Sequence, residues 1–204
     1  MESSLRSDIS RIYGRIGNDF MNQNETQWDK LLKIKTTGRD DSRSDQYRYP
    51  YEPTQYCVLE RLANNGLITK KNVLLDYGTG KGRVCFYLSY QTRCRSIGVE
   101  YDERIFESAE ANREHAVSGR KVSFELTSFF NPFSVEILRK VLAGIYESYY
   151  EKPREILLMF YYPSEEYLGC LMTEEQLMFY DEINTEDLFE GKNDREKILI
   201  FSVD

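Results

Sequence analysis

Three glycines at alternate positions, Gly78, Gly80 and Gly82, follow a short apolar run and precede a helical pattern. Glycine lets a backbone approach a ligand closely and adopt positive φ angles, so such a loop can cradle a bound molecule. The carboxylate of Asp76 stands just before the first glycine. It would repel a pyrophosphate and suits a ligand that carries a cationic ammonium or sulfonium group. The spacing therefore predicts a small-molecule site for a cationic ligand.

The same loop fails two common nucleotide-binding patterns. The dinucleotide pattern G-x-G-x-x-G/A needs glycine or alanine at its last position. That position holds Arg83 when the pattern is counted from Gly78, and Cys85 when it is counted from Gly80. A P-loop needs serine or threonine after its lysine, but Lys81 is followed by Gly82. The loop instead reads D-x-G-x-G-x-G. A different nucleotide ligand and a tight turn without a ligand remain as alternatives.

Apolar runs alternate with helical patterns from residue 54 onward, which is typical of a parallel sheet covered by helices. The predicted strands cover residues 73–75, 96–100, 122–126, 128–130 and 156–162, and the predicted helices cover residues 54–66, 83–90, 105–117 and 134–149. Two closing strands, 176–183 and 197–203, have no full helix between them and predict an antiparallel hairpin. The fold class expected is α/β, with a doubly wound, mostly parallel sheet, helices on both faces and an antiparallel C-terminal edge.

The first 50 residues differ from the rest in pattern. Apolar residues recur at spacings of three and four, which predicts one amphipathic helix: Leu5, Ile9, Ile12, Ile16 and Phe20. A polar, breaker-rich stretch over residues 37–45 predicts a loop or lid. We therefore expect an N-terminal helical extension with a lid or linker over residues 1–50, and a ligand-binding domain over residues 51–204.

Composition limits the partners. The chain has 204 residues, of which 41% are hydrophobic and 30% charged, and its formal net charge is −7. That balance suits a folded chain and argues against general nucleic-acid binding, although a local basic groove is left open. No apolar run reaches the ~18 residues of a membrane helix, and the N-terminus lacks the apolar core of a secretory signal. We expect a cytoplasmic protein that does not bind membranes.

Cysteine and histidine give little sign of metal or nucleophilic chemistry. The four cysteines contain no C-x-x-C pair: Cys57, Cys85, Cys94 and Cys170. The single histidine, His115, lies in a polar run that fits a solvated helix face. We expect no metal site, no disulfide framework and buried or half-buried thiols.

The glycine loop, with Asp76 before it and Glu100 at the end of the next predicted strand, resembles the class I S-adenosylmethionine (SAM) dependent methyltransferases. The resemblance implies a seven-stranded sheet whose last strand is antiparallel, and SAM as the cofactor. It implies that the loop contacts the methionine half of SAM and that Glu100 accepts both ribose hydroxyls, as suits an anionic bidentate acceptor. The cofactor-binding residues implied are Asp76, Tyr77, Gly78, Thr79, Gly80, Gly82, Glu100 and Tyr101.

A second motif bears on the methyl acceptor. Asn131, Pro132 and Phe133 resemble a motif of methyltransferases that act on planar amino nitrogens. Together with residues 49–54, the glycine loop and residues 161–164, they resemble a group of small bacterial members of the family. The resemblance implies that Asn131 positions the target nitrogen while the aromatic ring stacks on the planar group. The same residues also fit a turn that starts the next helix with Ser134 as its N-cap, and the two interpretations do not exclude each other. Before the sheet, a further set of residues is expected to form a lid or pocket, or to pack the N-terminal segment: Tyr49, Tyr51 and Glu52.

The function expected is transfer of a methyl group from SAM to an acceptor that the sequence does not identify, whether a small molecule, a protein or an RNA. The alternative is a catalytically degenerate SAM-binding regulatory module. One departure from the family pattern bears on this choice. The link over residues 126–129 joins the third and fourth predicted strands almost directly, so either the adenine side of the site is open or a segment is absent there.

Overall fold

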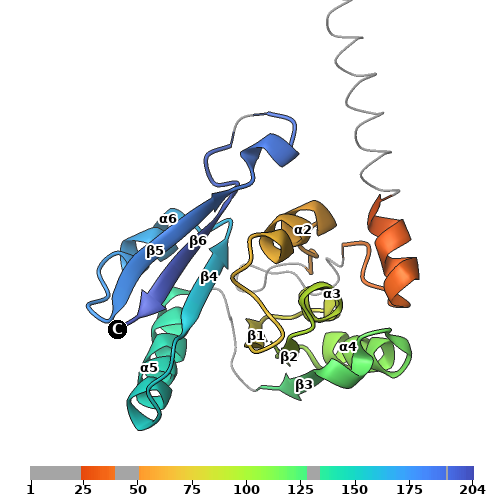
Figure 1. Cartoon of the computed structure of the whole chain (residues 1–204), viewed down its shortest axis with the longest axis horizontal. Coiled ribbons are helices and arrows are strands. Elements are labelled where there is room, and N and C mark those ends of the chain that lie inside the picture. Colours follow the sequence, from red (N-terminus) through yellow and green to blue (C-terminus); the bar gives the residue numbers. More distant parts are fainter. Residues whose placement is uncertain (1–23, 40–50, 128–133, 192) are drawn as a thin grey trace, which may run out of the picture. The chain divides into compact units, whose positions relative to one another are not determined.

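The computed structural model describes residues 24–39, 51–127, 134–191 and 193–204. The chain divides into two compact units, which we name the N-terminal unit (Met1–Ser128) and the C-terminal unit (Phe129–Asp204). Each unit combines helices with one three-stranded sheet (Figure 1). The α/β class predicted from the alternating pattern is therefore confirmed.

The N-terminal unit contains a parallel sheet in the order β1-β2-β3. Its strands are β1 (Val73–Tyr77), β2 (Arg95–Glu100) and β3 (Val122–Leu126). Tyr77 pairs with Val99, and Glu100 pairs with Leu126, so the three strands end in register. The carboxyl ends of parallel strands meet at one edge of a sheet, and in open α/β sheets this edge is where ligands bind.

Helices connect these strands and cover one face of the sheet. After α2 (Tyr56–Asn64), α3 (Arg83–Thr92) joins β1 to β2, and α4 (Glu103–His115) followed by a 3-10 turn (Gly119–Lys121) joins β2 to β3. The Phe86 ring of α3 packs edge-on against Phe124 of β3, with ring centroids 5.5 Å apart. This contact fixes α3 against β3, an edge strand of the sheet.

The other face of β1 is open in the described part of this unit. Val73, Leu75 and Tyr77 alternate along the strand and are 58%, 44% and 47% exposed. The prediction of helices on both faces is therefore not confirmed for the N-terminal unit by its described residues.

A helix over residues 24–32 packs on α2 and α3 through aromatic rings. The Trp28 ring meets Tyr87 edge-on at 4.9 Å between centroids and lies 6.0 Å from Tyr56. The apolar stripe predicted between Leu5 and Phe20 lies outside the described residues. In the described part of the chain, every helix is too short or too polar to serve as a membrane span.

The C-terminal unit contains an antiparallel sheet in the order β4-β6-β5. Its strands are β4 (Leu157–Tyr161), β5 (Leu177–Asn184) and β6 (Lys197–Val203). The predicted hairpin is confirmed, because β5 and β6 pair antiparallel over most of their length, with a short 3-10 turn (Glu186–Leu188) in their connection. Two helices, α5 (Val135–Glu151) and α6 (Glu165–Leu171), complete the unit.

The core of the C-terminal unit joins these helices to the sheet. Alternate residues of β6 meet apolar residues of α5 and α6, forming a buried cluster of Leu138, Leu142, Cys170, Leu171, Leu177, Leu199, Phe201 and Val203. The Ser134 hydroxyl accepts a hydrogen bond from the Ile137 amide at 3.3 Å and so caps α5. This confirms the N-cap predicted from the sequence.

The expected single sheet of seven strands differs from what the described residues form, which is six strands in two sheets of three. The fourth predicted strand, 128–130, lies outside the described residues. The three parallel strands and the antiparallel closing pair keep the order along the chain that the sequence predicted, because their apolar runs and turns are local signals.

Candidate active site

The loop that follows β1 turns through three glycines with positive φ angles, 75° at Gly78, 59° at Gly80 and 87° at Gly82. Residues with a side chain rarely adopt such angles, so the backbone requires glycine here. The amides of Gly78 and Thr79 donate to the Val99 carbonyl at 2.9 and 3.1 Å. The predicted succession of strand, glycine turn and helix is thus confirmed, and the turn is fixed at the carboxyl end of β2.

Two of these glycines also make room for aromatic rings. A Cβ atom at Gly80 would overlap the ring of Tyr51, and a Cβ atom at Gly82 would overlap the rings of Phe124 and Phe86. Close contact of this kind leaves no space for any side chain. The loop therefore packs directly against Tyr51 and against the aromatic core of the sheet.

Asp76 lies in β1 opposite Gly98 and is half-buried. Its Oδ2 accepts a weak hydrogen bond from the Cys85 thiol, whose sulfur is 3.8 Å away. Burial of the carboxylate raises the pKa of Asp76 to about 6, and hydrogen bonds from Thr79 and Cys85 offset only part of that increase. No basic side chain within the described ranges forms an ion pair with Asp76. Among the described residues, the carboxylate is therefore a negative charge without a cationic partner.

Glu100 ends β2, is only 4% exposed and faces the glycine loop. Its Oε2 accepts a hydrogen bond from the Gly80 amide at 2.8 Å. Its Oε1 accepts from the amides of Tyr101 at 2.9 Å and Asp102 at 3.0 Å. A carboxylate offers about four acceptor positions, so these bonds leave about one open, on Oε2.

Tyr51, one of the predicted lid or pocket residues, lies against the loop at Gly80, and its role in a pocket stays a prediction. Its hydroxyl donates to the Thr36 carbonyl at 2.7 Å, which fixes the ring. The Lys81 ammonium lies 4.5 Å from the centre of that ring, in cation–π geometry. Glu52 instead points to solvent, 68% exposed, where it forms an ion pair with Arg39 at 3.2 Å.

The other predicted residues divide by position. Tyr77 ends β1 on the open face, and Thr79 is 6% exposed with its hydroxyl 3.5 Å from the Cys85 sulfur. Tyr101 follows Glu100 and donates its amide to it. Four predicted residues lie outside the described part of the chain, and their roles remain predictions: Tyr49, Asn131, Pro132 and Phe133.

Comparison with solved structures identifies the fold. The structure resembles a human methyltransferase 10 domain containing protein at 14% identity and a TM-score of 0.53, over 92% of this chain and 97% of that one. It resembles a TehB-like SAM-dependent methyltransferase from Corynebacterium glutamicum at 15% identity and a TM-score of 0.50, over 92% and 100%. The chain has a class I methyltransferase fold. A protein in the NADB-Rossmann superfamily from Streptococcus agalactiae is also similar, at 14% identity and a TM-score of 0.52, over 75% and 69%.

The sequence itself gave no match to a protein-family model or to a curated protein. At these identities the likeness is one of fold. The sequence resemblance had already indicated two parts of this fold, the parallel strands and the glycine loop after β1.

Arg83, the first residue of α3, anchors the end of the glycine loop and was not among the predicted site residues. Its guanidinium is 2% exposed and forms ion pairs with Glu25 and, at 3.8 Å, with Asp29. It donates through Nε to the Thr36 hydroxyl at 2.7 Å and through Nη2 to the Thr37 hydroxyl at 3.1 Å. A buried charge with this many partners holds the segment over residues 24–37 firmly against the loop.

Asp29 completes this network. Its two oxygens accept from the amides and hydroxyls of Thr36 and Thr37, and from the Tyr56 hydroxyl at 2.6 Å. Burial alone would raise the pKa of Asp29, but these hydrogen bonds bring it below its ordinary value. The Tyr56 ring also lies under the Arg83 guanidinium, 4.3 Å from its carbon. One sequence signal could have indicated this role, namely the two carboxylates Glu25 and Asp29 four residues apart on one helix face.

Asn112 of α4 holds the loop from a third element. Its side-chain amide donates to the Lys81 carbonyl at 3.0 Å and to the Lys35 carbonyl at 3.3 Å, and its oxygen accepts from the Lys35 amide at 2.8 Å. Hydrogen bonds from β2 and α4 therefore fix the loop backbone, and Asn112 also joins it to the N-terminal segment at Lys35. The arrangement is a rigid loop that presents two carboxylates and one aromatic ring.

Proposed function

We propose that the chain is a SAM-dependent methyltransferase whose cofactor lies at the glycine loop of the N-terminal unit. The observation that carries this proposal is the convergence of two carboxylates on one loop: Glu100 holds the Gly80 amide at 2.8 Å, and Asp76 precedes the loop without a cationic partner in the part of the chain that the structure describes. The class I methyltransferase fold supports the same assignment, since the similar protein from Corynebacterium glutamicum is described as a SAM-dependent methyltransferase.

The chemistry of SAM fits the groups present. SAM carries a cationic amino group and a cationic sulfur, and Asp76 would stabilise positive charge at the loop. The acceptor position left on Glu100 Oε2 suits one hydroxyl of the ribose, while a second bond would need the Gly80 amide to move away. The Tyr51 ring already has a cation against its face, the Lys81 ammonium, and is suited to hold the sulfonium.

Methyl transfer of this kind depends mainly on position. When bound, SAM supplies an electrophilic methyl group. An acceptor nucleophile attacks this methyl group in line, and S-adenosylhomocysteine (SAH) is the leaving group. The chain itself contributes orientation and exclusion of water, through a loop fixed by Val99, Glu100 and Asn112 and covered by Tyr51.

Calorimetry with SAM tests the cofactor assignment. We expect wild-type protein to bind SAM and Glu100→Ala to weaken binding by more than about tenfold. Glu103→Ala, which removes an exposed carboxylate at the start of α4, is the matched control and should leave the affinity unchanged. An unchanged affinity in Glu100→Ala would remove Glu100 from the site, and SAM binding without methyl transfer to any acceptor would favour a regulatory module.

The acceptor side of the proposal is Asn131, with Pro132 and Phe133. We keep the expectation that the Asn131 oxygen accepts a hydrogen bond from a planar amino group and so aligns its nitrogen with the methyl donor. A tritium-labelled methyl group from SAM, offered to small molecules, protein and RNA in a cell extract, would identify the acceptor. Asn131→Ala should then abolish turnover while SAM affinity stays, and transfer that survives this change would contradict the amino-nitrogen assignment.

A further inference from the structure

Six basic residues gather at the end of the parallel sheet opposite to the glycine loop. We name them the basic edge: Lys70, Lys71, Arg93, Arg95, Arg120 and Lys121. Arg95 begins β2 and pairs with Val73, the first residue of β1, and Lys121 directly precedes β3. Because parallel strands begin at one edge and lie about 4.8 Å apart, these residues are brought together although the sequence separates them.

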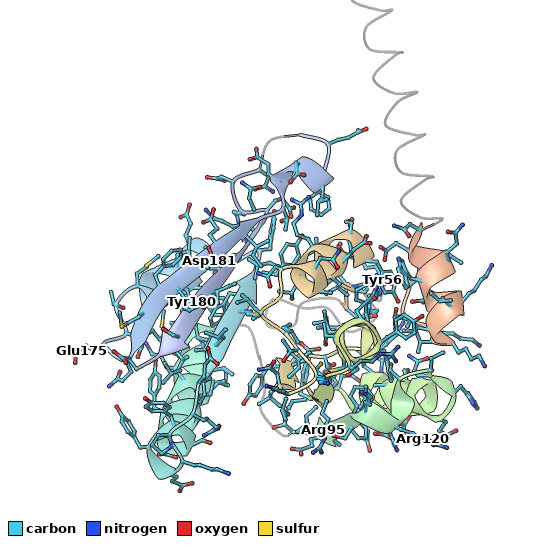
Figure 2. The ribbon with its side chains drawn as sticks, viewed as in Figure 1. Tyr56, Arg95, Arg120, Glu175, Tyr180 and Asp181 are labelled. Atoms are coloured by element: carbon cyan, nitrogen blue, oxygen red, sulfur yellow. The ribbon has the colours of Figure 1, made fainter. Side chains whose placement is uncertain are left out.

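Local contacts hold this arrangement. The Lys121 ammonium donates to the Arg93 carbonyl at 2.7 Å, which joins the start of β3 to the end of α3. Arg93 caps α3 in the left-handed conformation, with φ of 67°, and so turns the chain into β2. Figure 2 shows Arg95 and Arg120 on the same side of the N-terminal unit.

The positive charge of the basic edge is not balanced nearby. Five of the six side chains are exposed and Lys121 is half-buried, and none of them forms an ion pair with another described residue. Residues 61–75, 77–99 and 115–124 contain no aspartate or glutamate. On the adjoining end of α4, Glu110 is already paired with Arg113 at 2.6 Å, which leaves Glu114 as the other carboxylate there.

We propose that the basic edge binds the phosphodiester backbone of a nucleic acid. Like charges held together repel one another, and a chain of phosphates relieves that repulsion and releases its own counterions. The whole chain has 34 acidic and 27 basic residues, so the basic edge is a local exception in an acidic molecule. A narrow polyanion can follow such an edge, whereas a broad anionic membrane would also face the acidic remainder of the surface.

This surface is separate from the proposed cofactor site. Strands of five or six residues place their two ends about 17–20 Å apart, so the basic edge is not part of the glycine loop. Contacts to phosphates position a nucleic acid without reading its bases. The binding is therefore expected to depend little on sequence or sugar, and it does not require that SAM binds.

Fluorescence anisotropy with labelled single strands of about 20 nucleotides, one RNA and one DNA of the same sequence, tests the proposal at about 50 mM and about 200 mM salt. We expect the two strands to bind within about threefold of each other and affinity to fall steeply with salt. The triple variant Lys70→Gln, Lys71→Gln, Arg95→Gln should bind about tenfold or more weakly, with a shallower salt dependence.

A second triple variant provides the matched control. Lys140→Gln, Lys152→Gln and Arg139→Gln remove the same charges from exposed positions of the C-terminal unit. If both triple variants bind the nucleic acid equally weakly, net charge alone accounts for the effect and the proposal is overturned. It would also be overturned by absence of binding at the lower salt concentration, or by binding to phosphatidylserine vesicles alone. SAM calorimetry on the first triple variant should match wild type, which keeps failure here distinct from failure of the cofactor site.

Discussion

Arg83 and Asp76 flank the same glycine loop, and the surroundings of their two charged groups differ. The Arg83 guanidinium is buried and surrounded by partners, with two carboxylates, two threonine hydroxyls, a carbonyl of Thr54 and the Tyr56 ring in contact with it. Among the described residues, the Asp76 carboxylate receives only hydrogen bonds from Thr79 and the Cys85 thiol, and burial raises its pKa to about 6.

The difference indicates a structural role for Arg83 and agrees with the ligand-binding role that we propose for Asp76. A charge taken out of water is costly unless the protein supplies its counterpart, which it does for Arg83. At Asp76 the counterpart is missing among the described residues, so the ionised carboxylate lowers the stability of the folded chain until a cation binds. We therefore expect changes at Arg83 to act on folding and changes at Asp76 to act on ligand binding.

Removing the Arg83 charge should have the largest effect. Arg83→Met leaves Glu25 and Asp29 without their cation and should lower the free energy of unfolding by about 3–5 kcal/mol, measured by urea denaturation. Arg113→Met breaks the exposed pair with Glu110 and should cost less than about 1 kcal/mol. Equal losses in the two variants would mean that Arg83 is not the anchor of the loop.

Gly82, which lies between Asp76 and Arg83 in the sequence, should give the next largest change in stability. Gly82→Ala adds a methyl group that overlaps Phe124 and Phe86 at a φ of 87°, so unfolding free energy should fall by about 2 kcal/mol or more. Gly144→Ala has open space inside α5 and should raise that free energy by about 0.5–1 kcal/mol. If both glycines tolerate alanine, the loop is not held as closely as the contacts indicate.

Asp76→Asn should raise stability and lower ligand affinity at once. Because folding raises the pKa of Asp76 from 3.8 to about 6, the folded chain binds more protons in that interval, and this group makes stability fall as pH rises through it. At neutral pH the asparagine variant should therefore be more stable by about 1–2 kcal/mol in urea denaturation. Lower stability in Asp76→Asn would show that the carboxylate has a structural role like that of Arg83.

Lys81 should give the smallest change and sharpen the role of Tyr51. Its ammonium occupies the ring face that a sulfonium would use, so Lys81→Gln should tighten SAM binding by about two- to fivefold. The affinity for SAH, whose sulfur is neutral, should stay within about twofold of wild type. A parallel gain for both molecules in calorimetry would argue against competition between Lys81 and the sulfonium.

Local signals account for what the sequence could predict. The strand and glycine pattern around Asp76 and the position of Glu100 follow from short apolar runs and turn residues, which need no knowledge of distant contacts. The two carboxylates Glu25 and Asp29 are a local signal, but nothing local links them to Arg83, because Glu25 is 58 residues away from it in the sequence. The contact of Tyr51 with Gly80 and the basic edge likewise appear only when distant segments are brought together.

The open face of β1 and the number of strands in each sheet could not be predicted from the sequence for a different reason. Alternation of strands and helices predicts which elements form, and Val73–Tyr77 formed as expected. It does not determine which faces become covered, because that depends on how segments far apart in the chain pack. The exposure of Leu75 and the two separate three-stranded sheets are therefore findings of the structure.

Calorimetric titration of SAM between about pH 5 and pH 7.5, on wild type and Asp76→Asn, tests the central claim most directly. With the pKa of Asp76 at about 6, the carboxylate is mostly protonated at the lower pH, and wild-type affinity should be roughly tenfold weaker there. Glu100 and the Cys85 thiol face the same carboxylate and are kept in both proteins, so the asparagine variant isolates Asp76. Binding of SAM to Asp76→Asn should be weak and nearly independent of pH. An equal pH dependence in both proteins, or none in wild type, would contradict the central claim.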